Sequence, residues 1–151
     1  MSAAPSKPGP GAAVLQVCET FLSIQGESTW AGTPCFFIRL AGCNLRCAYC
    51  DTAYAWSGGR PAAVGTLVDE FKRSGLACAE VTGGEPLLQA ATPALLDALC
   101  RARPGAAVLL ETNGSRDISV VPPGVVTILD IKCPGSGEQA AMEWANLDRL
   151  R

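Results

Sequence analysis

Short apolar segments that alternate with helix-like segments are the feature that most limits how this 151-residue chain folds. Apolar runs typical of buried strands predict strands at residues 14–24, 34–40, 77–82, 107–111 and 125–131. Helical patterns predict helices at residues 66–74, 92–103 and 138–150, and glycine and proline predict a break at residues 57–61. Such alternation is typical of parallel βα units, so we expect an α/β fold, a partial (βα) barrel with parallel strands.

Polar or glycine-rich residues follow four of these strands, in the sequences CNLRC, TGGEP, ETNG and DIKCP. The C-terminal ends of the strands of a βα barrel meet on one rim, where binding sites are built. The four strand ends therefore predict a single site on that rim.

Composition narrows the class of protein. The chain is long enough for one domain, 48% of its residues are hydrophobic and its net charge is -2, which argues against a nucleic-acid partner. No apolar run reaches about 18 residues, so no membrane partner is expected. Residues 1–13, MSAAPSKPGPGAA, predict a flexible tail without an export signal, followed by one domain over residues 14–151. We expect a cytoplasmic location, where thiols stay reduced.

Three cysteines lie within one predicted loop, because Cys43, Cys47 and Cys50 have the spacing C-x3-C-x2-C. Cysteine thiolates hold iron–sulfur clusters and structural zinc. Zinc prefers a closed set of four ligands, yet the chain has no histidine and no second CxxC pair. An open [4Fe–4S] cluster, whose fourth iron takes a small molecule, explains three thiols better than zinc does.

The other cysteines stand alone in the sequence. A zinc ion could recruit one of them as its fourth ligand, and in predicted strands or helices they are also small apolar core residues. No role follows from the sequence for Cys18, Cys35, Cys78 and Cys100.

The cysteine spacing, with Tyr49 before the third cysteine, resembles the radical S-adenosylmethionine (radical SAM) superfamily. Gly83–Pro86, GGEP, resembles the second motif of that superfamily, although alone it is more often a plain turn. Glycines permit close backbone approach, and a carboxylate suits the ammonium group of S-adenosylmethionine. The resemblance implies a radical SAM barrel.

The flanking residues resemble one family of that superfamily, the 7-carboxy-7-deazaguanine synthases of queuosine and 7-deazapurine biosynthesis. The matching stretches are FLSIQGESTWAGTPCFFIRLAGCNLRCAYCDTAYAW, VTGGEPLLQ, LLETNGS and LDIKCPGSG, in the family's order. The resemblance extends over residues 17–151. It implies an iron–sulfur lyase that converts 6-carboxy-5,6,7,8-tetrahydropterin to 7-carboxy-7-deazaguanine with loss of ammonia.

The resemblance also implies a role for individual residues. It implies that Cys43, Cys47 and Cys50 bind the [4Fe–4S] cluster and that Thr52 binds Mg²⁺. The residues implied around S-adenosylmethionine are Tyr49, Gly84, Glu85, Asn113, Ser115, Lys132, Cys133, Pro134, Gly135 and Ser136. The residues implied around the substrate are Ile24, Gln25, Gly26, Glu27, Arg39 and Thr82.

Elementary chemistry agrees with several of these roles and leaves alternatives for others. A threonine oxygen suits Mg²⁺, although Thr52 could instead form a turn or helix cap beside Asp51. Gln25 and Glu27 supply the acceptors and donors that a pterin's pyrimidine edge requires. Arg39 lies inside a predicted strand, where a charge needs a partner, either the substrate carboxylate or a structural ion pair. Lys132 could also be a solvent-facing strand end.

The family further implies an electron donor such as flavodoxin or ferredoxin, and a homodimer. The chain departs from the family at Ser28, where a glycine-like residue is usual, and at its end, where family members continue with further strands and a helix. We therefore expect a truncated barrel that lacks its closing C-terminal elements. The alternatives are another radical SAM enzyme of the activating-enzyme type, or an inactive iron–sulfur or zinc-binding domain.

Overall fold

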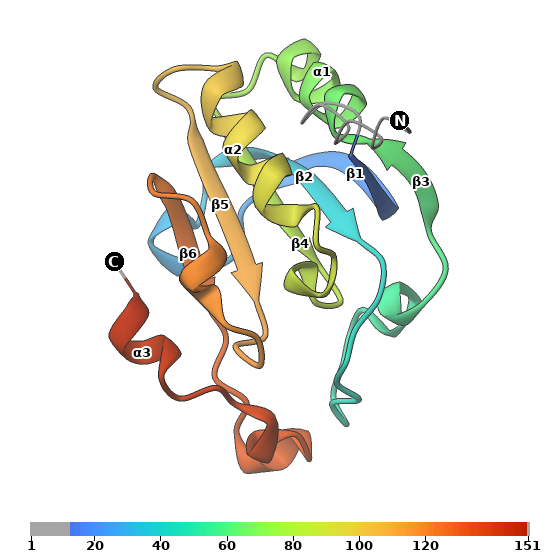
Figure 1. The fold of residues 1–151 in the computed structure, drawn as a ribbon, viewed down its shortest axis with the longest axis vertical. Helices are drawn as coiled ribbons and strands as arrows, with labels where there is room; N and C mark the ends of the chain where they lie inside the picture. Colours follow the sequence, from blue (N-terminus) through green and yellow to red (C-terminus); the bar gives the residue numbers. More distant parts are fainter. Residues whose placement is uncertain (1–12, 151) are drawn as a thin grey trace, which may run out of the picture.

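One six-stranded sheet organises the computed structural model, which describes residues 13–150 (Figure 1). The predicted tail over residues 1–13 lies outside the described residues except for Ala13. The spatial order of the strands is β3-β1-β2-β4-β5-β6. Their bounds are β1 Val14–Ile24, β2 Pro34–Leu40, β3 Arg60–Ala63, β4 Cys78–Gly83, β5 Ala107–Thr112 and β6 Val125–Leu129.

The sheet is mostly parallel. Strands β2, β4, β5 and β6 run parallel to one another, whereas β1 is antiparallel to both β2 and β3. The expected α/β fold with parallel strands is confirmed, and the antiparallel start is an addition to it. Within residues 13–150, β6 forms a free edge, so the sheet is not closed into a barrel.

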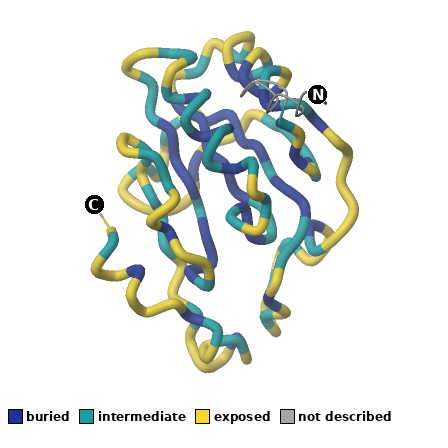
Figure 2. The backbone as a smooth tube through the Cα atoms, viewed as in Figure 1, coloured by how far each residue is buried: buried dark blue, intermediate teal, exposed yellow. Residues whose placement is uncertain are grey.

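Helices α1 (Val64–Ser74) and α2 (Thr92–Ala102) cover one face of the sheet (Figure 1). Helix α1 buries Val64, Leu67, Val68 and Phe71, which recur at the spacing of one helical face. It ends at Gly75, whose φ of 73° suits a residue without a side chain. The main core lies between these helices and the sheet, and Figure 2 shows the buried central strands.

The opposite face of the sheet carries a smaller apolar cluster. Cys35, Phe37, Cys78 and Leu109 are buried there, and Phe21 stacks on Phe37 with ring centroids 4.9 Å apart. Two of the unassigned cysteines therefore lie in this cluster as core residues. Polar side chains lie on the same face closer to the C-terminal strand ends, so this face leads into the site.

Strand β3 corrects the break predicted at residues 57–61. It pairs with the start of β1, where Gln16 lies opposite Pro61. Proline is tolerated in edge strands because its missing N–H removes no bond from the interior of the sheet. The glycines precede the strand and the proline lies within it, so these residues did not prevent the strand from forming.

The helix predicted over residues 138–150 is also wrong, because this segment forms only a 3-10 turn at Gln139–Ala141 and one short α-helix, α3, at Asn146–Arg149. The buried Asn146 side chain donates to the carbonyls of Gly114 and Arg116 and accepts from the Ile118 amide. The Glu143 amide also donates to Gly114 O, at 3.0 Å. These bonds fix the segment to the loop after β5 and override its helical pattern. None of the helices in residues 13–150 is long and apolar enough to cross a membrane.

Candidate functional site

A polar cleft of about 580 Å³ lies at the C-terminal ends of the parallel strands. It brings together the loops after β2, β4, β5 and β6, as the four polar strand ends predict. The lining residues are Glu27, Arg39, Cys43, Leu45, Cys47, Tyr49, Cys50, Asp51, Thr52, Tyr54, Trp56, Thr82, Gly83, Gly84, Glu111, Thr112, Asn113, Asp130 and Lys132.

The cysteine loop is held by its backbone, and Cys43, Cys47 and Cys50 all line the cleft. The Gly42 amide donates to Ala55 O at 2.8 Å, and the Ala48 amide donates to Ser136 O at 2.9 Å. The three thiols are partly exposed and form no disulfide.

The arrangement of the thiols suits a cluster better than one metal ion. In residues 13–150, no three histidine, cysteine or acidic side chains converge on a point that could hold a single ion. Cysteines that bind three different irons of a cubane do not need to converge. Three cysteine thiols that line one cleft are the ligand type of a [4Fe–4S] cluster, so the residues present suit that group.

The glycines of the GGEP motif pack directly against the cysteine loop. A Cβ atom at Gly84 would lie 2.6 Å from Cys43 Cβ and would also meet the Gly42 carbonyl. The Glu85 amide donates to Gly42 O at 2.8 Å. Only glycine fits at position 84 without moving the loop, so the two motifs form one packed unit.

Glu85 itself lies inside the protein and does not line the cleft. Its carboxylate accepts bonds from the Leu87 amide at 2.9 Å, the Asn113 amide at 2.8 Å and the Thr112 hydroxyl at 2.9 Å. Burial raises the pKa of Glu85, and these hydrogen bonds oppose the rise. The geometry thus gives Glu85 structural partners where the sequence predicted contact with S-adenosylmethionine.

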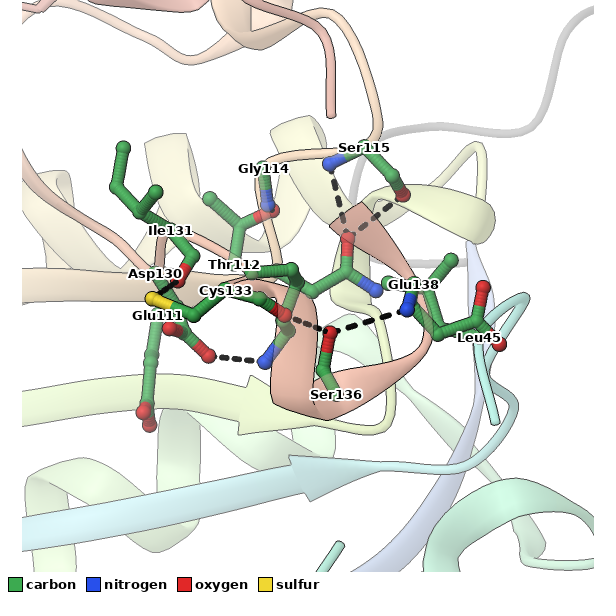
Figure 3. Close-up of polar contacts among 12 residues, drawn as sticks. Leu45, Glu111, Thr112, Gly114, Ser115, Asp130, Ile131, Cys133, Ser136 and Glu138 are labelled. Atoms are coloured by element: carbon green, nitrogen blue, oxygen red, sulfur yellow. Dashed lines mark hydrogen bonds and ion pairs between the residues drawn. The ribbon is translucent and has the colours of Figure 1, made fainter. Parts of the chain in front are cut away.

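Asn113 carries the third motif to the cysteine loop. Its Nδ2 donates to Cys43 Sγ at 3.8 Å and to Asn44 Oδ1 at 3.4 Å. Its Oδ1 accepts from the Ser115 amide at 3.0 Å and from the Ser115 hydroxyl at 2.6 Å, and Figure 3 shows the two dashed lines that leave Ser115. Asn113 lines the cleft, whereas Ser115 supports it from behind.

The stretch after β6 closes the far side of the cysteine loop. The buried Ser136 donates to the Cys133 carbonyl at 2.7 Å and accepts from the Glu138 amide at 3.0 Å (Figure 3). Lys132 lines the cleft and forms an ion pair with Asp130. Of the ten residues predicted around S-adenosylmethionine, those that line the cleft are Tyr49, Gly84, Asn113 and Lys132.

Three of the six predicted substrate residues, Glu27, Arg39 and Thr82, line the cleft. Gln25 does not, because its buried amide donates to the Glu80 carboxylate and its Oε1 accepts from the Glu27 amide at 2.8 Å. Gln25 therefore fixes the turn that carries Glu27.

Two other predicted substrate residues, Ile24 and Gly26, are also absent from the lining, and Ile24 is 63% exposed. Thr52 does line the cleft, and it begins the 3-10 turn Ala53–Trp56. Its side chain forms no capping bond there but donates to Asp51 Oδ1 at 2.6 Å. The helix-cap alternative for Thr52 therefore has no support in the geometry.

Acidic residues that the sequence analysis did not select also reach the cleft, chiefly Glu111 and Asp130. Thr82 donates to Glu111 Oε2 at 2.8 Å, and Glu80 lies buried behind them. Burial and the nearby Glu111 raise the pKa of Glu80 to about 8, and Glu111 also raises the pKa of Glu27. These acids could have been found from the alternation of side-chain direction along β4 and β5, because it places the acids on the face of the sheet opposite the helices.

Comparison with known proteins defines the class to which this fold and site belong. The Radical SAM superfamily matches residues 37–126, so the chain belongs to that superfamily.

Curated relatives of this chain bear the name 7-carboxy-7-deazaguanine synthase. The relative from Chlorobaculum tepidum is 50% identical over 125 residues, which are 83% of this chain and 56% of that protein. The relative from Koribacter versatilis is 44% identical over 140 residues, 90% of this chain and 60% of that protein. The chain thus spans between half and two thirds of the length of these relatives.

A solved structure agrees in fold. The crystal structure of QueE from Escherichia coli superposes with a TM-score of 0.77 at 26% identity, over 91% of this chain and 68% of that one. The partial sheet and its loops are therefore arranged as in a radical SAM protein of this kind.

Proposed function

We propose that this chain is the cluster-bearing part of a lyase that converts 6-carboxy-5,6,7,8-tetrahydropterin to 7-carboxy-7-deazaguanine with loss of ammonia. One observation carries the proposal: the three motif cysteines line the same cleft as Arg39, Thr52 and Glu27. A radical source and groups suited to a carboxylated pterin thus share one cavity. Relatives named 7-carboxy-7-deazaguanine synthase support the choice of substrate.

The cofactors of the proposal are a [4Fe–4S] cluster, S-adenosylmethionine and Mg²⁺. When bound, the cluster and S-adenosylmethionine supply a 5′-deoxyadenosyl radical that takes a hydrogen from the substrate. Cys43, Cys47 and Cys50 would hold three irons of the cluster, and Asn113 and Lys132 line the same cleft. Thr52 offers its hydroxyl oxygen to Mg²⁺, a cation that prefers oxygen ligands.

The chain's own side chains bind and orient the substrate. Arg39 pairs with its carboxylate, because a guanidinium offers two parallel donors to a carboxylate. Glu27, on the other part of the cleft, accepts bonds from N–H groups of the pterin ring. Two such anchors hold the reacting carbon in one place, which is the main contribution a protein makes to a radical rearrangement.

The wider setting belongs to the same proposal. An electron donor such as flavodoxin or ferredoxin reduces the cluster, and the enzyme works as a homodimer in the cytoplasm. The family resemblance supports these features.

The test is anaerobic reconstitution of the 151-residue chain with iron and sulfide. Dithionite, S-adenosylmethionine, Mg²⁺ and 6-carboxytetrahydropterin are then added, and 5′-deoxyadenosine and 7-carboxy-7-deazaguanine are measured. Both products are expected, and the variant Arg39→Ala should retain the cluster but lose the second product. Deoxyadenosine without the deazaguanine would favour another radical SAM activity. A protein with an intact cluster that forms neither product would favour an inactive iron–sulfur domain.

A further inference from the structure

A β-bulge in β1 turns Glu19 toward the cleft side of the sheet. The register of β1 against β2 pairs Val17 with Leu40 and Glu19 with Arg39, so β1 has one extra residue at this point. Before the bulge, Val17 packs in the core beneath the helices. After it, Phe21 packs on the opposite face. Val17, Glu19 and Phe21 occupy every second position of the strand, so without the bulge all three would lie on the same face. Bulges re-aim side chains in this way, and here the bulge places Glu19 beside Arg39.

One oxygen of Glu19 holds two side chains of the cleft wall. Glu19 Oε1 accepts from Arg39 Nε at 2.8 Å and from the Tyr54 hydroxyl at 2.9 Å. The Arg39 guanidinium also lies over two rings, 5.5 Å from the centroid of Phe21 and 5.9 Å from that of Tyr54. These contacts fix both the position and the plane of the guanidinium.

The terminal nitrogens of Arg39 are left for a ligand. Within residues 13–150, Arg39 forms its hydrogen bond to Glu19 through Nε, and no side chain or carbonyl bonds its terminal nitrogens. Arg39 lines the cleft, whereas Glu19 does not. The arrangement matches an arginine held from behind so that its remaining donors face an incoming carboxylate.

We infer that Glu19 is the positioning residue for carboxylate recognition, because it orients Arg39 and, through Tyr54, fixes the segment that follows Thr52. The inference rests on the proposed function and deepens it. A mobile arginine side chain loses conformational entropy when it binds a ligand. An arginine that is already held in place has lost this entropy before binding, so binding costs less free energy. Through Tyr54, the same carboxylate links the Arg39 side of the cleft to the proposed Mg²⁺ side.

The substitution Glu19→Leu, which removes both the charge and the acceptor, separates positioning from simple charge. Removing the negative charge beside Arg39 would strengthen binding of an anion if only the local potential mattered. Removing the acceptor of the Arg39 Nε bond would weaken binding if orientation matters. The two explanations therefore predict opposite signs for the same variant.

The experiment measures binding by calorimetry to the reconstituted, S-adenosylmethionine-loaded chain with Mg²⁺, under anaerobic conditions. Two ligands are compared, 6-carboxytetrahydropterin and tetrahydropterin without the carboxylate. Glu19→Leu should weaken the first by about tenfold, the scale of a lost charge-assisted hydrogen bond, and leave the second unchanged. Tyr54→Phe should weaken the first by a smaller factor. The control Asp97→Asn breaks an exposed ion pair with Arg101 on α2 and should change neither.

Unchanged or tighter binding of the carboxylated ligand by Glu19→Leu would overturn the inference, as would equal weakening of both ligands. A readout without substrate is the NMR resonance of the Arg39 Nε–H group, which should lose its hydrogen-bonded shift and exchange faster in Glu19→Leu. An unchanged resonance would also overturn the inference. If the wild-type chain binds neither pterin, the proposed substrate is wrong, and this resonance alone decides whether Glu19 positions Arg39.

Discussion

Replacing Glu85 tests whether the glutamate of the GGEP motif supports the structure or binds a ligand. Its buried carboxylate accepts bonds from the amides of Leu87 and Asn113 and from the hydroxyl of Thr112. Glu85→Ala would remove the acceptor of all three donors at once. We therefore expect the variant to be destabilised even in the absence of iron and S-adenosylmethionine.

The size of the effect follows from the three donors. A buried donor without a partner costs about 1–3 kcal/mol, so the low end for three donors is about 3 kcal/mol. Burying the carboxylate costs free energy, and this burial also raises the pKa of Glu85. The alanine variant avoids that cost, so its net loss of stability should stay near the low end. Glu85→Gln retains one acceptor oxygen but sets an NH₂ group against one amide, so it should cost about 1–3 kcal/mol. The total free energy of unfolding of a single domain is only about 5–15 kcal/mol, so both losses of stability are measurable.

The assay is urea unfolding of the apo chain, followed by circular dichroism. The matched control is Glu70→Ala, which removes a partly exposed acid of α1 and should stay within about 0.5 kcal/mol of the wild type. If Glu85→Ala left the apo stability unchanged and only weakened S-adenosylmethionine binding, Glu85 would be a ligand and the structural reasoning would be refuted.

Three further predictions concern the cleft. The native state holds the Glu80 proton more tightly than the unfolded chain does, so the free energy of unfolding should fall as the pH rises from about 4.5 to about 8. Glu80→Gln should remove this part of the slope, and an identical pH profile in the variant would contradict the assignment. Alanine at Cys43, Cys47 or Cys50 should abolish incorporation of four irons in an iron and sulfide assay, whereas Cys100→Ala on α2 should retain them. Gly84→Ala should cost about 1–3 kcal/mol of stability in urea unfolding, because its Cβ would overlap the cysteine loop. Gly26→Ala, where a Cβ meets nothing within 4 Å, is its control, and equal stability of the two variants would show that the loop yields freely.

The main strands could be predicted because their signals are local. The bounds predicted for β1 and β2 match the structure, those of β4 differ by one residue at each end, and those of β5 differ by one residue at the C-terminal end. Long apolar runs bounded by glycine and polar residues leave few alternatives. The polar strand ends also predicted that one cleft would collect the four motif loops, since parallel strands end on one rim.

The features that could not be predicted depend on contacts between distant parts of the chain. β3 forms because β1 offers it an edge, and the segment near Asn146 is shaped by carbonyls of the loop after β5. The direction of Gln25 depends on a glutamate 55 residues away. A hydrophobic pattern contains none of this information, because it records the preference of each segment and not its partner.

The three motif loops hold one another in a closed circuit of contacts, and this circuit explains why residues away from the cleft matter to it. The Glu85 amide donates to Gly42 O in the cysteine loop, and the Glu85 carboxylate accepts from the Asn113 amide after β5. The Asn113 side chain then returns to Cys43 Sγ. The loops are therefore ordered before any ligand arrives, and binding need not supply the free energy to order them. Glu19 does the same for Arg39 on the other wall of the cleft, so both halves of the site rest on a carboxylate that does not line it.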